Sequence, residues 1–151
     1  MAKERNREDT EDRAKPYRDA RWHKMTPKFG AVQDIDHLEY TIVDNEVVPI
    51  AVLELTLGEL NKNKNEYPIN YLNAITKRFK TEIQGKFITS LARQLNVNAF
   101  IILFNRDVST LAVYNLSKDK GWKHYTWSEY QRFLKNLYSH VLEEKKTLQS
   151  S

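Results

Sequence analysis

The chain lacks cysteine altogether, and it contains only four glycines and four prolines in 151 residues. Without cysteine it has no disulfide, no thiolate metal site and no cysteine nucleophile. Glycines this sparse and scattered exclude a glycine-rich loop that cradles phosphates. No apolar run approaches the roughly 20 residues that span a bilayer, and the polar amino terminus is unlike a signal peptide. We therefore expect a soluble cytoplasmic protein with no membrane partner.

Positive charge is also missing from one stretch of an otherwise basic chain. The net charge is +4, yet residues 31–56 hold six Asp and Glu and no Lys or Arg. Residues 1–30 carry +3 and residues 57–93 carry +4. Basic flanks attract a polyanion, whereas clustered carboxylates can hold a cation. Ordinary solvated lysines would explain the net charge alone, but the segregation favours a metal-dependent protein that acts on a polyanion.

The length suits a single domain with its own core. Residues 1–12 are almost entirely charged or polar and predict a flexible arm, residues 13–145 a single domain, and residues 146–151 a frayed tail. Apolar periodicity predicts a helix over 16–25, strands over 32–43 and 47–57, a helical region over 69–95 that can break near Gly85, strands over 100–104 and 108–116, and a helix from 127. The order α-β-β-α-β-β-α indicates an α/β fold with a mixed sheet flanked by helices.

The last predicted helix has a recognisable start. Thr126 and Glu129 form a capping box, in which each side chain satisfies a backbone amide of the other residue. The following stripe of aromatic and aliphatic residues is typical of a helix that packs on a core.

The predicted strand 47–57 is apolar on both faces, which is typical of a central strand with helices on either side. Glu54 is the exception, and a lone carboxylate there is costly to desolvate unless a cation or hydrogen bonds compensate. In the preceding strand Asp34 and Asp36 point to one face. Carboxylates on two adjacent strands are a way to bind a hard cation, so we predict Asp36, Glu54 and Asp34 as metal ligands.

The segment Asp34-Ile35-Asp36, followed by Glu54-Leu55-Thr56 and a basic helix, resembles the PD-(D/E)xK nuclease superfamily over residues 12–142. The resemblance implies a restriction-endonuclease-like fold and an endonuclease that hydrolyses phosphodiester bonds. It also implies Mg²⁺ or Mn²⁺ as cofactor, with Asp36 and Glu54 at the catalytic site. We expect DNA rather than RNA as the substrate, and a homodimer if both strands of a duplex are cut.

The chain departs from the family at Thr56, because the family has a lysine two residues after its Glu. A neutral hydroxyl cannot stabilise a phosphoryl group by charge. Either Lys86 or Lys80, on the following helical region, reaches the site instead, or the protein is a catalytically degenerate member that binds nucleic acid or a protein partner without cleavage. We include Thr56 and Lys86 among the catalytic candidates. Gln94 resembles the polar residue that the family often carries on its sheet-covering helix.

Basic residues on two predicted helices are candidates for phosphate contacts. They are Arg18, Arg21 and Lys24 in the first helix and Lys77 and Lys80 in the region 69–95. The alternative is that they form only the solvated side of helices packed through apolar residues. The four histidines are scattered, and none has the spacing of a zinc site.

Overall fold

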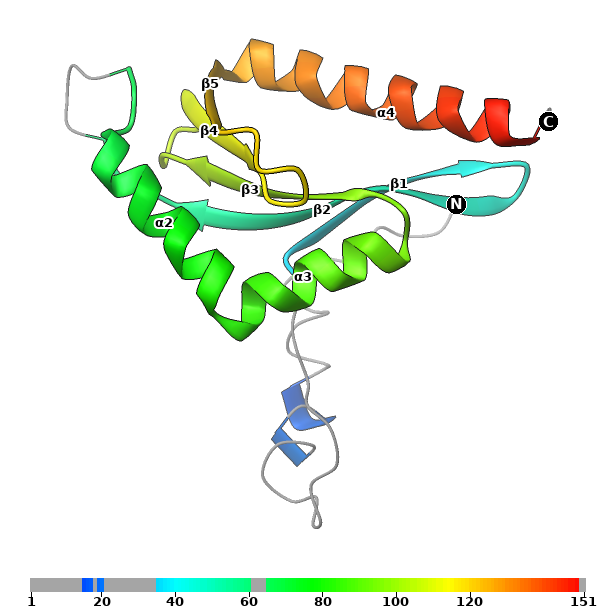
Figure 1. Cartoon of the computed structure of the whole chain (residues 1–151), viewed down its shortest axis with the longest axis horizontal. Helices are drawn as coiled ribbons and strands as arrows, with labels where there is room; N and C mark the ends of the chain where they lie inside the picture. Colours follow the sequence, from blue (N-terminus) through cyan, green and yellow to red (C-terminus); the bar gives the residue numbers. More distant parts are fainter. Residues whose placement is uncertain (1–14, 18, 21–34, 61–64, 150–151) are drawn as a thin grey trace. The chain divides into compact units, whose positions relative to one another are not determined.

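The structure is a computed structural model that describes residues 15–17, 19–20, 35–60 and 65–149 (Figure 1). The chain divides into two units, Met1–Val32 and Gln33–Ser151. In the first unit the described residues are helical, and Lys15 Nζ lies 2.7 Å from Asp19 Oδ2. This agrees with a helix that starts near Pro16. The predicted phosphate contacts Arg18, Arg21 and Lys24 lie outside the described residues.

The second unit contains a five-stranded mixed sheet. Its strands lie side by side in chain order: β1 (His37–Val43), β2 (Glu46–Leu57), β3 (Asn98–Phe104), β4 (Thr110–Asn115) and β5 (Trp122–Thr126). The central neighbours β2 and β3 are parallel, whereas the other neighbours are antiparallel. Parallel neighbours need a long crossover, which α2 (Ile69–Thr81) and α3 (Ile83–Gln94) provide. The predicted α/β class with a mixed sheet is confirmed, whereas the restriction-endonuclease-like arrangement stays a prediction.

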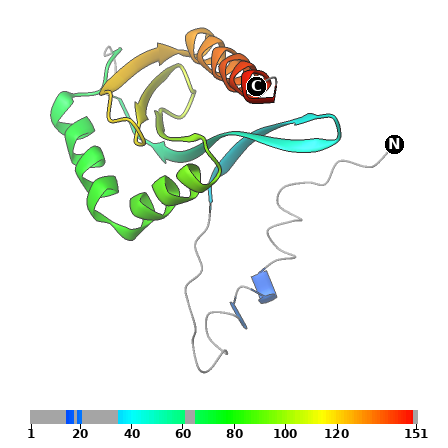
Figure 2. The same cartoon turned by 45° about the vertical axis from the view of Figure 1, so that its right-hand side comes forward.

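Helices cover both faces of this sheet (Figure 2). On one face α2 and α3 bury a core that includes Val52, Leu103, Leu72 and Ile88. On the other face α4 (Trp127–Gln149) packs over a second core, to which it contributes the buried side chain of Tyr130. The continuous apolar run of β2 is buried on both faces, as the sequence predicts. Among the described helices, none is long and apolar enough to cross a membrane.

The predicted break in the region 69–95 is present and lies at Glu82, between α2 and α3. Glu82 is extended, with φ −85° and ψ 156°, so it can continue neither helix. Gly85 stands in the first turn of α3, where an added Cβ would lie 1.5 Å from the carbonyl oxygen of Phe79. Only glycine allows the two helices to turn so sharply against each other.

The structure differs from the expected elements in three places. Strand β5 was not predicted, because five residues that alternate only loosely and are at best half-buried give little periodic signal. The helix α4 continues to Gln149, past residue 145, where the sequence predicts the start of a frayed tail. The strand predicted over 32–43 is recognised from His37, and a register shift between Glu39 and Tyr40 interrupts its alternation.

The predicted capping box is confirmed. At the start of α4, Thr126 N–H donates to Glu129 Oε1 at 3.0 Å, and Glu129 N–H donates to Thr126 Oγ1 at 3.2 Å. In the hairpin between β1 and β2, Asp44 and Asn45 have φ of 51° and 68°. Two successive residues with positive φ are the signature of a tight hairpin turn.

Candidate functional site

Glu54 is the only charged side chain that is buried among the described residues, with 4% of its surface exposed. It lies on β2, on the face of the sheet that α2 and α3 cover. Its neighbours on this face of β2 are Val52, which is fully buried, and Thr56, which is half-buried. Removing a carboxylate from water is costly unless other groups compensate, so the contacts of Glu54 define the candidate site.

Asp36 lies directly before β1 and faces Glu54. The antiparallel register pairs His37 with Leu53, and one further step along both strands places Asp36 opposite Glu54. Its Oδ2 accepts a hydrogen bond from the N–H of Leu55 at 3.0 Å. Because β1 begins only at His37, the Asp36 side chain takes the place of a strand partner for this amide. The structure therefore brings together the predicted pair Asp36 and Glu54.

The two oxygens of Glu54 differ in their surroundings. Oε1 accepts a hydrogen bond from Nε2 of Gln84, on α3. Oε2 is buried and has no hydrogen-bond partner in the described part of the chain. A buried carboxylate oxygen without a donor is uncommon and costs free energy. A proton or a cation would satisfy this oxygen.

The protonation of Glu54 reflects this environment. Burial raises the pKa of Glu54 to about 7, and two effects of Asp36 act in the same direction: its negative charge, and the hydrogen bond that Asp36 accepts when Glu54 is protonated. Arg78 and the hydrogen bond from Gln84 act in the opposite direction, because both favour the ionised carboxylate. Close carboxylates can share one proton near neutral pH. A divalent cation would relieve the same repulsion, and its preferred ligands are such hard oxygens.

Sequence reasoning missed Gln84 and Arg78 as parts of this site. Gln94, which was predicted to resemble the family's helix residue, is exposed at the end of α3, and among the described contacts it is Gln84 that reaches Glu54. The guanidinium carbon of Arg78 lies 4.9 Å from the ring centroid of Phe79, which favours a fixed orientation. The one available signal was the position of Gln84, which directly precedes Gly85, where the sequence predicts a break.

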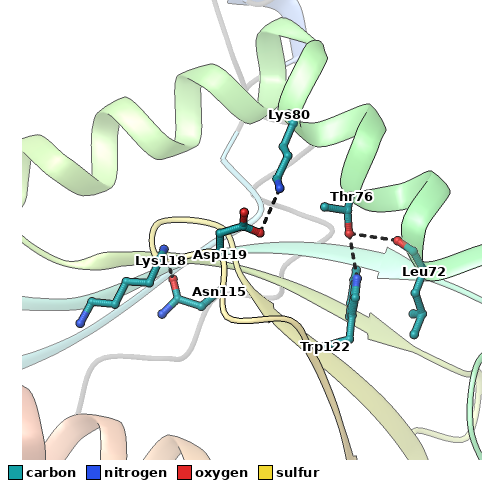
Figure 3. Close-up of polar contacts among 7 residues, drawn as sticks. All are labelled: Leu72, Thr76, Lys80, Asn115, Lys118, Asp119 and Trp122. Carbon is teal, nitrogen blue, oxygen red and sulfur yellow. Dashed lines mark hydrogen bonds and ion pairs between the residues drawn. The ribbon is translucent and has the colours of Figure 1, made fainter. Parts of the chain in front are cut away.

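The predicted lysines lie elsewhere in the described structure. Lys86 follows Gln84 by two positions and so points about 200° around α3 from it. It lines a cavity together with Lys80, and Lys80 Nζ forms an ion pair with Asp119 Oδ1 at 2.9 Å (Figure 3). Lys77 is exposed on α2. On the described helices α2 and α3, it is Arg78 whose positive charge lowers the pKa of Glu54.

The third predicted metal ligand, Asp34, lies outside the described residues. Within the described ranges, no three His, Cys, Asp or Glu side chains gather into a group that could hold a metal ion. Of the three predicted ligands, the described structure places Asp36 and Glu54 opposite each other, and their role as metal ligands stays a prediction. Both offer the carboxylate oxygens that Mg²⁺ and Mn²⁺ prefer.

Comparisons with known protein families, with curated proteins and with solved structures found no match to this chain. The resemblance to the PD-(D/E)xK superfamily therefore stays a prediction that rests on the motif residues. The functional argument depends on the geometry of Asp36, Glu54 and the residues around them.

Proposed function

We propose that the protein is a divalent-cation-dependent nuclease that hydrolyses phosphodiester bonds in DNA at a site formed by Asp36 and Glu54. The observation that carries this proposal is the facing pair of carboxylates, in which Glu54 Oε2 is buried without a partner in the described structure. A structural carboxylate is normally satisfied by donors. This one is left open beside a second carboxylate.

The donor set fits Mg²⁺ or Mn²⁺. Asp36 and Glu54 would hold the cation through hard oxygen atoms, and Asp34 is the expected third ligand. When bound, such a cation supplies charge stabilisation at phosphoryl oxygens and makes a water molecule more acidic.

The chain's own residues hold and tune this pair. Gln84 holds Oε1 of Glu54 by a hydrogen bond from α3, and Oε2 is left without a donor in the described structure. The N–H of Leu55 fixes Asp36 in the same way from β2. Arg78 brings a positive charge to the side of the sheet where the family has its lysine. A guanidinium binds phosphate oxygens with two parallel hydrogen bonds, so we assign Arg78 the attraction and orientation of the substrate phosphate that Thr56 cannot provide.

A second candidate is a protein of the same fold that binds nucleic acid without cutting it. Thr56 at the lysine position favours this candidate, as does the placement of Lys86 in a cavity on the other side of α3. The two candidates share the charge distribution and differ in whether the carboxylate pair takes part in chemistry.

A cleavage assay separates the candidates. Wild-type protein, Asp36→Asn and Glu54→Gln are incubated with single-stranded and duplex DNA and RNA in Mg²⁺ or Mn²⁺, beside Glu143→Gln on the exposed side of α4 as a matched control. The nuclease predicts cleavage of DNA by wild type and control, and a loss of roughly 100-fold or more in the two site variants. Calorimetric titration with Mn²⁺ gives a second readout, and binding should disappear in Glu54→Gln. Unchanged cleavage by Glu54→Gln would overturn the assignment, whereas binding of DNA without cleavage by wild type would favour the second candidate.

A further inference from the structure

A cavity of about 380 Å³ lies between α2 and α3, away from the carboxylate pair. Its polar lining comes from three cationic side chains, Lys80, Lys86 and Arg93, and from the hydroxyls of Thr89 and Ser90. Apolar side chains, such as Leu116 after β4, complete its wall. Among the described residues, no carboxylate lines it. A concave site with several convergent donors and an apolar wall is the usual form of a ligand site.

Three of the four polar residues that α3 contributes to the cavity lie in one stripe and have unpaired side-chain donors within the described structure. Lys86, Ser90 and Arg93 follow each other at spacings of four and three residues, which places them on one side of the helix. Thr89 Oγ1 donates to the carbonyl of Gly85 at 2.7 Å, so its hydroxyl proton is used. Within the described ranges, the hydroxyl of Ser90 has no hydrogen bond, and neither Lys86 nor Arg93 has a carboxylate partner. The stripe therefore presents two cations and a hydroxyl to whatever enters the cavity.

The third cation is held at the rim by the loop between β4 and β5 (Figure 3). Asp119 Oδ1 lies 2.9 Å from Lys80 Nζ, and both side chains are largely exposed. The loop is fixed from within, because Asn115 Oδ1 accepts the N–H of Lys118 at 3.0 Å. Asp119 thus offsets one of three positive charges and leaves the cavity with a net positive charge.

We propose that this cavity binds a backbone phosphate of a nucleic-acid strand, at a position separate from Asp36 and Glu54. Charge-assisted hydrogen bonds from Lys and Arg, joined by a hydroxyl, are the usual contacts to phosphate oxygens. The cavity lies on the opposite side of α3 from Gln84, so it positions a strand and does not join the reacting groups. The choice of nucleic acid rather than another phosphate ligand rests on the proposed function.

The first test removes two of the donors. Lys86→Gln combined with Arg93→Gln is compared with Lys123→Gln combined with Lys135→Gln, which removes the same charge from exposed sites on β5 and α4. Fluorescence anisotropy measures the affinity for labelled single-stranded and duplex oligonucleotides over a range of salt concentrations, and circular dichroism checks the fold. Because the slope counts the phosphates that are neutralised, loss of the one phosphate contact should decrease the salt slope of the cavity variant by about 0.7 for single strands and about 0.9 for duplex. An equal decrease in the matched pair would mean general electrostatic attraction and would overturn the proposal.

The second test acts in the opposite direction. Asp119→Asn releases Lys80, and asparagine keeps the positive φ of 53° at this position. Binding should become tighter and its salt slope steeper. Unchanged or weaker binding would contradict the assignment of Lys80 to the cavity.

Two further arms separate the sources of phosphate and the two proposals. Pyrophosphate should compete with the oligonucleotide only weakly. If pyrophosphate binds, and the salt dependence of oligonucleotide binding is the same in the cavity variant as in wild type, the cavity is a site for a small free phosphate ligand and the inference is overturned. Absence of binding to any oligonucleotide would overturn this inference. Binding without cleavage by wild type would overturn the proposed nuclease alone, whereas cleavage with an unaltered salt slope in the cavity variant would overturn this inference alone.

Discussion

Nε2 of Gln84 donates a hydrogen bond to Oε1 of Glu54 and links the crossover between the parallel strands to the carboxylate on the central sheet. The contact has two effects. It satisfies one oxygen of a buried charge, and it leaves the other oxygen, Oε2, without a partner in the described structure. The properties of the site follow from this asymmetry.

Removing the amide of Gln84 should destabilise the fold. Gln84→Leu leaves both oxygens of Glu54 without a donor, so we expect a loss of about 1–3 kcal/mol in the free energy of unfolding, measured by urea denaturation. Gln94→Leu, on the exposed end of the same helix, should change it by less than about 0.5 kcal/mol. In a Glu54→Leu background the effect of Gln84→Leu should shrink, and equal losses in both backgrounds would show that the two side chains are not coupled.

The free energy of unfolding should decrease as the pH rises from 4.5 to about 7. Glu54 has a pKa of about 7 in the folded state, against an ordinary value of 4.5. The folded state therefore binds the proton more strongly, and the free energy of unfolding decreases from pH 4.5 to pH 7 by up to about 3 kcal/mol. Glu54→Gln should lack this decrease, as measured by denaturation at a series of pH values. At pH 8, Mn²⁺ should restore stability to wild type only. A wild-type profile parallel to that of Glu54→Gln would contradict the raised pKa.

Neutralising Arg78 should affect both the carboxylate and the substrate. The positive charge of Arg78 lowers the pKa of Glu54, so Arg78→Gln should raise this pKa further, as followed by carbon NMR of the side-chain carboxyl. If Arg78 orients the substrate phosphate, turnover should fall by roughly 10-fold to 100-fold, and Arg78→Lys should recover part of it. Lys123→Gln serves as the charge-matched control. A drop in turnover with no change in the pKa of Glu54 would place Arg78 too far away for the assigned role.

The turn between α2 and α3 should tolerate no side chain at Gly85. A Cβ there would lie 1.5 Å from the carbonyl oxygen of Phe79, so Gly85→Ala should destabilise by about 3 kcal/mol or more or prevent folding. Gly121 is a useful contrast, because it has a positive φ of 83° but nothing within 4 Å of an added Cβ. Gly121→Ala should cost only about 1 kcal/mol. Similar losses of melting temperature in the two variants would show that α2 and α3 are not held in this contact.

Much of the fold could be predicted because the buried elements have strong periodic patterns. The apolar run that includes Val52 predicts a central strand, and the Thr126–Glu129 capping box marks the start of α4. Strand β5 was not predicted because Trp122 to Thr126 is short and, among the described strands, pairs with β4 alone. Such a strand is defined by its neighbour rather than by its own residues.

The part of the site that could be predicted is the pair of residues whose positions are determined by strand pairing. Asp36 and Glu54 come together through the register of two strands, which alternation and a short hairpin constrain. Gln84 and Arg78 depend on how two helices turn at Glu82, and sequence spacing does not give that angle. The prediction of Lys86 treated the region 69–95 as a basic surface and could not tell the side of α3 that faces β2 from the side that faces Lys80.

The crossover also has a consequence for the order in which the protein assembles. When the ribosome has released the chain only as far as Leu57, both Asp36 and Glu54 are present, but Gln84 and β3 have not yet been made. The β1–β2 hairpin alone would leave Glu54 in water with an ordinary acidity, and an isolated hairpin is at best marginally stable. The carboxylate is removed from water only when α3 packs on the sheet and β3 pairs with β2. This parallel pairing should be slow, because the chain between the two strands is a long loop to close. In a nascent chain the pKa of Glu54 should rise late, in the same step that completes the sheet.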